Sequence, residues 1–206
     1  GAARVDTTSW TWQYFNTGNS GLPSNRVLAI HLATRQTWIG TDRGLAMMTF
    51  PDGAWTTYSV ASSPLPSDVV TCISVDREGG VWVGTEAGVA VLRGSAWTVY
   101  RHSGSPLPDD RVTALLAGDT PDVWIGTAGA GAARISSGGW RIFNTANSSL
   151  PSDHVTAISV VWPSGSIWLG TDRGLARFTG EDAAPMPADE LRARPPTIRE
   201  ETEPRP

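Results

Sequence analysis

The chain has 206 residues, of which 40% are hydrophobic and 17% charged, with a formal net charge of −4 and a pI near 5.3. This length suits one domain with a sizeable core, and the acidic balance argues against nucleic-acid or anionic-membrane partners. The single cysteine, Cys72, excludes an intrachain disulfide, and the lack of lysine excludes a Schiff-base or phosphate-loop lysine. No apolar run reaches the ~18 residues that predict a membrane-spanning helix.

The first predicted strand follows residues 1–11, which are mostly small and polar and are expected to form a flexible N-terminus. The strand is an aromatic and β-branched stretch, which is typical of β-structure. Four copies of this outer strand occur, at Trp12–Phe15, Trp55–Tyr58, Trp97–Tyr100 and Trp140–Phe143. Each copy is followed by a loop that is rich in Gly, Ser and Asn and ends in Leu-Pro.

An inner strand opens with Val shortly after each Leu-Pro, and its third residue is small. The small residues are Ala29, Cys72, Ala114 and Ala157. Strands that crowd around an axis need small side chains, so we predict that these strands are the innermost ones. Because a free cysteine in such a position is usually buried and unreactive, we expect Cys72 to serve as a small hydrophobic residue.

A second strand carries the motif Trp-x-Gly-Thr, and a third strand follows it after a tight turn that ends in glycine. The motif begins at Trp38, Trp82, Trp124 and Trp168, with spacings of 44, 42 and 44 residues. A fixed period of this size indicates a repeat architecture. The repeated tryptophans and aromatic residues are therefore expected to fill the core between repeats.

The composition changes at about Gly180. Residues 180–206 have alternating charges, frequent prolines and no aromatic residue. Such a segment cannot bury enough apolar surface to join a packed core, so we predict a disordered or extended tail. A proline-rich charged tail can serve as a spacer or as a strap that docks on a neighbour.

Four antiparallel strands per repeat are typical of a β-propeller blade. We predict an all-β fold in which residues 12–179 form a four-bladed propeller of about 43 residues per repeat. The last repeat lacks an outer strand, so Trp12–Phe15 is expected to complete it and close the ring, which removes exposed sheet edges. The alternative is an open arc that pairs with a second copy or with missing chain.

The joint pattern of an outer aromatic stretch, Leu-Pro-Ser-Asp, Val-x-Ala-Ile and Trp-Ile-Gly-Thr-Asp-x-Gly-Leu-Ala resembles the two-component-regulator propeller repeat. The resemblance covers residues 12–178 four times over. It implies a bacterial β-propeller located in the periplasm or outside the cell, as in sensor ectodomains, and often tied to carbohydrate sensing. The family repeat carries no catalytic residues. The chain departs from the family in its small number of repeats and in lacking a kinase or DNA-binding region.

Strand alternation places the Leu-Pro loops and the turns after Gly-Thr at the same end of the propeller, its top face. Loops on a rigid frame commonly carry binding residues. The candidate ligand-binding residues are those at which the repeats differ or carry charge: Arg26, Asp42, Arg43, Glu86, Arg111, His154, Asp172 and Arg173. Arg26 and Arg111 are expected to face each other across the ring, where both could bind one anion or sugar. Exposed Asp–Arg neighbours can also be simple surface pairs of little energetic value.

The predicted function is a non-catalytic binding module that presents this face to a protein or to a small polar ligand such as a carbohydrate. A structural subunit of a larger assembly, with homo-oligomers formed through the propeller or the tail, is the alternative. A propeller-based lyase or hydrolase is less favoured, because no nucleophile with a partner base is visible. No cofactor, metal site or nucleic-acid partner is predicted.

Overall fold

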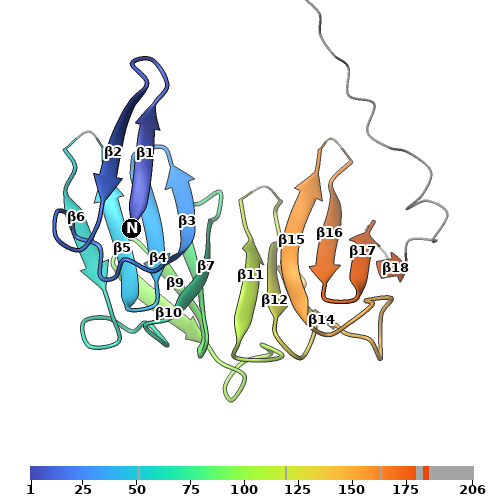
Figure 1. The fold of residues 1–206 in the computed structure, drawn as a ribbon. Helices are drawn as coiled ribbons and strands as arrows, with labels where there is room; N and C mark the ends of the chain where they lie inside the picture. The colour runs from blue at the N-terminus through green and yellow to red at the C-terminus, as the bar shows by residue number, and fades with distance from the viewer. Residues whose placement is uncertain (51, 119, 163, 180–182, 186–206) are drawn as a thin grey trace, which may run out of the picture.

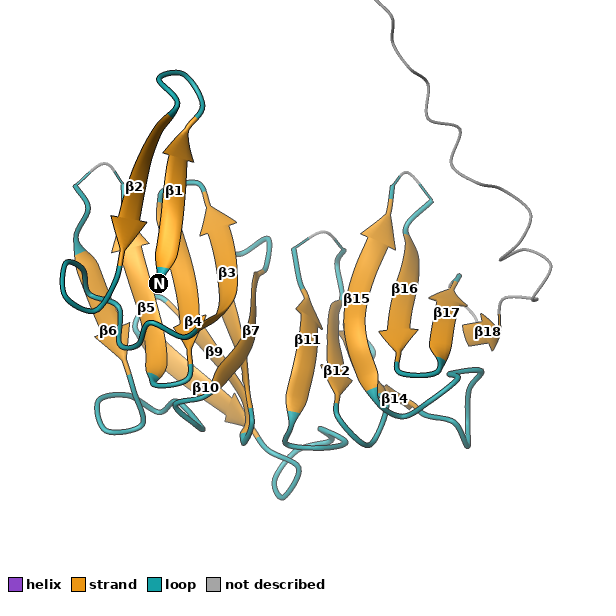
Figure 2. Cartoon of the chain, in the orientation of Figure 1, coloured by secondary structure: helices purple, strands orange, loops and turns teal. Residues whose placement is uncertain are grey.

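The computed structural model describes residues 1–50, 52–118, 120–162, 164–179 and 183–185, and these residues form strands, turns and loops without any helix (Figures 1 and 2). Consequently, this part of the chain contains no helix that could cross a membrane. The strands form one two-stranded and four four-stranded antiparallel sheets, all joined by connections between sequence neighbours.

The four larger sheets follow one another along the chain, and each contains an inner, a second, a third and an outer strand in that order. Sheet 1 comprises β3 (Val27–Ala33), β4 (Gln36–Thr41), β5 (Gly44–Thr49) and β6 (Trp55–Tyr58). Sheet 2 comprises β7 (Val70–Val75), β8 (Val81–Thr85), β9 (Gly88–Arg93) and β10 (Ala96–Tyr100). Sheet 3 comprises β11 (Val112–Leu116), β12 (Val123–Thr127), β13 (Ala132–Ser136) and β14 (Gly139–Phe143). Sheet 4 comprises β15 (Val155–Val161), β16 (Ser166–Thr171), β17 (Gly174–Phe178) and β18 (Ala183–Pro185).

The core lies between the sheets, which stack face to face. We call the face that packs on the next sheet the front face, and the face that packs on the previous sheet the back face. Trp82 and Val89 on the front of sheet 2, for example, pack with Ile125 and Ala133 on the back of sheet 3. Stacked aromatic pairs such as Trp82 and Tyr100, with ring centroids 6.1 Å apart, lie within these layers. The expectation that the repeated aromatics fill the space between repeats is therefore met here.

The glycine of Trp-x-Gly-Thr lets neighbouring sheets approach closely. A Cβ atom on Gly126 of β12 would lie 2.7 Å from Cγ1 of Val155, the first residue of the next inner strand. Gly40 and Gly84 approach Val70 and Val112 in the same way. A strand glycine is expected where another backbone or side chain comes this close. The repeated glycine is therefore a packing requirement between sheets.

The prediction that Trp12–Phe15 completes the last sheet is wrong in this structure. These residues belong to β2 (Thr11–Phe15), which pairs with β1 (Ala2–Asp6), while β17 pairs with β18. The reason is local: Gly1–Val5 has nearly the same sequence as Gly131–Ile135, so β1 is a third strand. It pairs with β2 in the register of sheet 3, with Ala2 opposite Phe15 as Ala132 is opposite Phe143.

The N-terminal hairpin, β1 and β2, packs on the back of sheet 1 as the outer half of a further sheet would. Phe15 contacts Trp55, with ring centroids 5.6 Å apart. The amino group of Gly1 donates to the carbonyl of Asn25, as the backbone nitrogen of Gly44 does to Asp68. Residues 2–6, which were expected to be flexible, are therefore ordered by the same contacts that join the larger sheets.

The four sheets form an open arc, so the closed ring expected from the sequence is absent from the described residues. Extensive contacts join β3 to β7, β7 to β11 and β11 to β15, whereas none of that extent joins β3 to β15. Figure 1 shows β7 and β11 lying between these end strands. On the front of sheet 4, Leu175 is 43% exposed, whereas its counterparts Leu45 and Val89 are 0% exposed. Apart from Ala183–Pro185, which form β18, the predicted tail lies outside the described residues.

The glycine contacts predict a difference between two alanine variants. Gly126→Ala forces a methyl group against Val155 and should lower the free energy of unfolding by about 1–3 kcal/mol. Gly170→Ala places its methyl no nearer than 3.5 Å to Ala157, and should change stability by less than about 0.5 kcal/mol. Urea unfolding of both variants measures the difference. An equal loss in Gly170→Ala would mean that another sheet covers sheet 4 in solution.

Cys72 on β7 provides a second prediction. Cys72 is partly buried, and desolvation raises the pKa of its thiol to about 12, with hydrogen bonds from Thr71 and Gly84 opposing the rise. At pH 8 the folded protein should therefore react with a thiol reagent such as DTNB far more slowly than the urea-unfolded chain, whose thiol has a pKa near 8.5. The absorbance of released thionitrobenzoate measures both rates. Prompt reaction of the folded protein would show that Cys72 is accessible and that its packing is misassigned.

Candidate functional site

The eight candidate residues lie at one end of the sheets, which we call the Leu-Pro end and which forms the lower edge of Figure 1. Backbone hydrogen bonds connect the residue before each inner strand with the turn after Gly-Thr. Asp42 donates to the carbonyl of Arg26 at 3.3 Å, and Asp172 donates to that of His154 at 3.3 Å. The two loop systems that the sequence analysis placed together are thus adjacent within each sheet.

Repeated polar residues hold the loops of the Leu-Pro end in place. Oδ1 of Asp110 accepts a hydrogen bond from the backbone nitrogen of His102 at 2.7 Å, and Asp153 accepts one from Thr145 at 2.7 Å. Asn25 and Asp68 make the equivalent bonds to residues eight positions earlier. The side chains of these four residues are therefore committed to the frame.

The threonine of each Gly-Thr closes the neighbouring turn. Oγ1 of Thr41 donates to the carbonyl of Gly44 at 2.8 Å and accepts from the backbone nitrogen of Arg43 at 3.1 Å. The same pair of bonds recurs at Thr85, Thr127 and Thr171. A repeated, hydrogen-bonded frame therefore carries the side chains that vary.

Two contacts between a basic and an acidic side chain form within single sheets at this end. Nη1 of Arg26 lies 3.9 Å from Oδ2 of Asp42, and Nδ1 of His154 lies 3.8 Å from Oδ2 of Asp172. The Arg26 side chain is 73% exposed, and those of His154 and Asp172 are each 45% exposed. Within the described residues, Oδ1 of Asp42 is buried without a hydrogen-bond partner. Because these contacts are long, the exposed side chains of Arg26, His154 and Asp172 stay available to a ligand.

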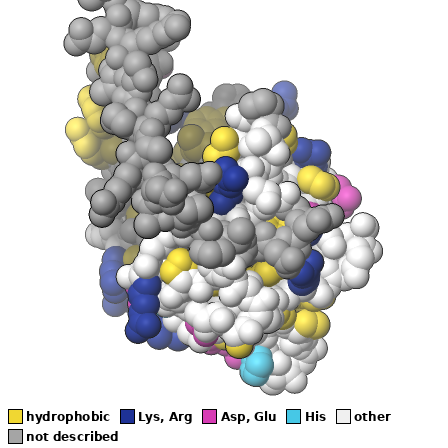
Figure 3. Space-filling model, turned by 90° about the vertical axis from the view of Figure 1, so that its right-hand side faces the viewer, with side chains coloured by type: hydrophobic (Ala, Val, Ile, Leu, Met, Phe, Trp, Pro, Cys, Tyr) yellow, Lys and Arg dark blue, Asp and Glu magenta, His cyan; other side chains and the backbone are white. Residues whose placement is uncertain are grey.

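The pKa of Asp172 lies below its ordinary value. The main cause is a hydrogen bond from the Ser152 side chain to the carboxylate; electrostatic interactions with His154 and Arg173 add to it, and desolvation opposes it. The carboxylate therefore stays ionised in the neutral and mildly acidic range. Figure 3, which views the array from the end that carries sheet 4, shows a histidine close to acidic side chains at the lower edge.

The remaining candidates, Arg43, Glu86, Arg111 and Arg173, are exposed at the same end. The expectation that Arg26 and Arg111 face each other across a closed ring is not met. Arg26 directly precedes the inner strand of sheet 1, and Arg111 directly precedes that of sheet 3. Sheet 2 stands between those two sheets in the open arc. The structure therefore pairs Arg26 with Asp42 and His154 with Asp172, and it spreads the candidates along an arc.

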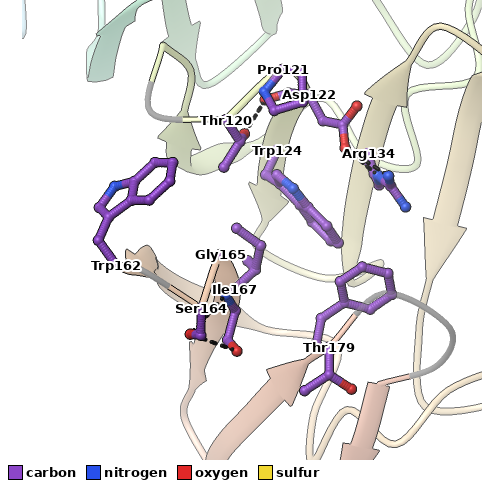
Figure 4. A pocket seen from close by; sticks show the side chains of 12 residues that line it. Thr120, Pro121, Asp122, Trp124, Arg134, Trp162, Ser164, Gly165, Ile167 and Thr179 are labelled. Carbon is purple, nitrogen blue, oxygen red and sulfur yellow. Dashed lines mark hydrogen bonds and ion pairs between the residues drawn. The ribbon is translucent and has the colours of Figure 1, made fainter.

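A pocket of about 320 Å³ lies between sheets 3 and 4 at the opposite end and was not foreseen from the sequence (Figure 4). Its rim includes Trp162, which is 58% exposed, and the side chain of Ser164. An exposed indole beside hydroxyl groups can stack on a sugar ring. The sequence feature that could have indicated this pocket is Trp162, because the equivalent turn between inner and second strands is polar in the other repeats.

Much of the polar lining of this pocket is already engaged. Nη2 and Nε of Arg134 contact Oδ2 of Asp122 at 2.6 and 2.8 Å. The guanidinium of Arg134 also lies 5.4 Å from the ring centroid of Phe178 and 5.8 Å from that of Trp124. Arg134 is therefore held by its own sheet and also contacts sheet 4. No group of three His, Cys, Asp or Glu side chains arranged for a metal occurs among the described residues.

Comparison with known proteins connects this geometry to a repeat family. Residues 64–87, which cover the Leu-Pro loop, the inner strand and the second strand of sheet 2, match the family model named two component regulator propeller. No curated protein matches the chain.

Three solved structures illustrate the fold. The extracellular domain of a hybrid two component system from B. thetaiotaomicron is 18% identical, with a TM-score of 0.70 over 82% of this chain and 24% of that one. PorZ, a surface component of the type-IX secretion system of Porphyromonas gingivalis, is 17% identical, with a TM-score of 0.64 over 92% and 30%. The computationally designed Ika4 protein is 15% identical, with a TM-score of 0.58 over 78% and 94%.

The chain spans about a quarter of the length of the first of these sensor domains. At these identities the structural likeness establishes the fold alone. The resemblance seen in the sequence is nevertheless confirmed, because the family model matches one complete Leu-Pro to Gly-Thr segment. Residues 64–87 thus match the two component regulator propeller repeat, and they lie in an all-β, propeller-like array of four-stranded sheets.

Proposed function

We propose that this protein is a non-catalytic binding module that presents its Leu-Pro end to a protein or a small polar ligand outside the cytoplasm. The observation that carries the proposal is the separation of frame and surface at that end. Asn25, Asp68, Asp110 and Asp153 are used by the frame, whereas the identity of the next residue varies among the sheets. A rigid frame with variable exposed side chains is the usual arrangement of a binding surface.

The charges at this end favour a ligand that carries both acceptors and donors. Arg26, Arg43 and Arg173 present guanidinium groups, which bind carboxylates and hydroxyl groups through fixed forks of donors. Asp42 and the ionised Asp172 add acceptors beside them. Acidic oligosaccharides and mixed-charge protein surfaces have matching chemistry, and we favour these two classes.

The location outside the cytoplasm is supported by the similar structures. The B. thetaiotaomicron neighbour is an extracellular domain, and PorZ is a bacterial surface component.

A second candidate function is a structural subunit of a larger assembly. It is favoured by exposed apolar residues at both ends of the array, including Ile30, Leu32 and Leu175, which are 53%, 75% and 43% exposed. Such residues are normally covered in a sheet stack, and a contiguous exposed patch marks an interaction site. The predicted role of the tail as a docking strap lies outside the described residues.

A panel of neutral and uronic-acid-containing oligosaccharides, measured by isothermal titration calorimetry, tests the binding proposal. For a hit at the Leu-Pro end, Arg26→Ala should weaken binding by about 5- to 100-fold if sheet 1 holds the ligand, and His154→Ala should do so if sheet 4 holds it, the loss expected for a charged hydrogen bond. Arg111→Ala tests whether sheet 3, the neighbour of sheet 4, also contacts the ligand. Arg35→Ala, an exposed arginine in the turn at the other end, is the matched control and should have no effect.

Trp162→Ala separates the two ends of the array. If binding of a panel member survives Arg26→Ala and His154→Ala but is lost in Trp162→Ala, the ligand site is the pocket between sheets 3 and 4. That result would contradict the assignment of function to the Leu-Pro end.

A further inference from the structure

One of the four loops at the Leu-Pro end departs from the frame that the other three share. Each loop begins with two residues that stand three positions apart: Asn16 and Asn19, Ser59 and Ser62, Arg101 and Gly104, and Asn144 and Asn147. In the three polar pairs, the backbone nitrogen of the first residue donates to the side chain of the second, at 2.8–3.0 Å. The pair of Arg101 and Gly104 lacks this bond, because glycine has no side chain.

The side chain of Arg101 is also used differently from its counterparts. Asn16 and Asn144 each accept a backbone hydrogen bond within the loop through Oδ1. Arginine has no acceptor atom, so Arg101 cannot make this bond. Its Nε donates instead to the carbonyl of Ala87, in the turn after Gly-Thr of sheet 2, at 3.3 Å. The guanidinium group of Arg101 is therefore held against a neighbouring turn, and its two terminal nitrogens carry the remaining donors.

Arg101 and Arg111 are neighbours at the base of this loop. The backbone nitrogen of His102 donates to the carboxylate of Asp110 at 2.7 Å, and the two arginines directly flank these bonded residues in the sequence. Both arginines are exposed. No acidic side chain of the described residues forms an ion pair with either of them. Two guanidinium groups therefore stand together here without an internal counter-charge.

Glu86 lies next to the two arginines, at the junction of sheets 2 and 3. Gly88 donates to the carbonyl of Asp110 at 2.8 Å, which joins the turn that carries Glu86 to the residue before Arg111. In sheets 1 and 4, the acidic residue of this turn lies 3.9 and 3.8 Å from a basic side chain of its own sheet. In sheet 2 the basic position is Val69, so Glu86 is exposed and has no ion-pair partner within the described part of the chain.

We propose that Arg101 and Arg111 bind a carboxylate group of the ligand at this junction, and that Glu86 accepts a hydrogen bond from a ligand hydroxyl group beside it. The inference rests on the proposed function and narrows its ligand class to oligosaccharides that contain uronic acid. Guanidinium groups bind carboxylates through matching forks of donors. Arg101, which was not among the candidate residues, is thereby assigned as a binding residue.

The position of Glu86 favours a uronic acid over a run of acidic side chains. A uronic acid carries one carboxylate together with several hydroxyl groups on the same ring, so it supplies an acceptor for the arginines and a donor for Glu86. A run of acidic side chains would bring a second carboxylate to Glu86, and two like charges at this separation repel each other.

Variants that exchange residues between repeats test the proposal while preserving the frame. Arg101→Asn introduces the residue of the first and last loops, and Arg111→Val introduces the residue of sheet 2. Each should weaken the binding of tetragalacturonate or tetramannuronate by about 5- to 100-fold in isothermal titration calorimetry. Glu86→Ala should weaken it as well, because the ligand hydroxyl loses its acceptor. The methyl-esterified probes, which keep the rings and hydroxyl groups but lack the charge, should bind the parent protein at least about tenfold more weakly.

Urea unfolding separates a binding role from a structural one. Asparagine at position 101 can accept the backbone hydrogen bond that Asn16 and Asn144 accept, so Arg101→Asn should unfold at the same urea concentration as the parent protein or at a higher one. If this variant unfolds at a clearly lower concentration and loses binding in parallel, Arg101 serves the frame and the proposal is overturned.

The remaining outcomes distinguish this proposal from the proposed function. If a uronic-acid probe loses affinity in Arg26→Ala or His154→Ala but keeps it in Arg101→Asn and Arg111→Val, the Leu-Pro end binds the ligand and the arginine pair does not. Equal affinity for a probe and its methyl ester, or tighter binding by Glu86→Ala, also overturns the proposal. Tighter binding of hexaglutamate through the same two arginines would assign the site to an acidic protein segment instead. If neutral and acidic oligosaccharides all fail to bind, the oligosaccharide form of the proposed function fails together with this inference.

Discussion

The fold depends on the contact between the glycine of one second strand and the valine that opens the next inner strand. Gly40, Gly84 and Gly126 let Val70, Val112 and Val155 approach so closely that a methyl group could not be inserted. This approach brings the threonine hydroxyls of the inner strands within reach of the valine carbonyls of the next sheet. It also allows the tryptophan beside each glycine to be covered. Trp38, Trp82 and Trp124 are 1–5% exposed, whereas Trp168, on the last sheet of the described array, is only partly buried.

Such an array is nearly one-dimensional, because each sheet is stabilised by its two neighbours and by little else. The internal sheets therefore have complete faces, while the ends do not. At one end the N-terminal hairpin covers the outer half of sheet 1 through Phe15 and Trp55, and leaves the inner half as a groove. At the other end the front of sheet 4 exposes Leu175. The exposed apolar surface is thus a consequence of repetition and not of poor packing within any sheet.

The strands, their order and their faces could be predicted from the sequence because the same residue pattern recurs in each repeat. Closure of the ring could not, because it depends on the small angle between successive sheets, which no residue type specifies. The misplacement of Trp12–Phe15 had a more local cause. The aromatic stretch was recognised as an outer strand, but the likeness of Gly1–Val5 to Gly131–Ile135 was overlooked, and that likeness supplies the partner strand next to it in the chain.

In the candidate site, too, contacts within one sheet could be predicted and contacts between sheets could not. The adjacency of Arg26 with Asp42 and of His154 with Asp172 follows from strand alternation within one sheet, so the sequence was sufficient to place each pair. The relation of Arg26 to Arg111 depends on the arrangement of whole sheets, and there the expectation failed. The pocket at Trp162 depends on two sheets as well, and the equivalent turns of the other repeats carry no tryptophan from which it could be inferred.

Arginine on the third strand shows how the same residue takes its role from its neighbours. Arg134 stands opposite Trp124 on sheet 3 and reaches the ring of Phe178 on sheet 4, so it links two sheets. Arg4 holds the matching position in the N-terminal hairpin and reaches the ring of Phe50 beside sheet 1, at 5.2 Å from the centroid. Arg177 occupies that position on sheet 4, the last sheet of the described array, and is exposed. The behaviour of Arg4 therefore places the hairpin in the stack as a true, though partial, member, and this membership is what gives the groove beside it the shape of a missing strand pair.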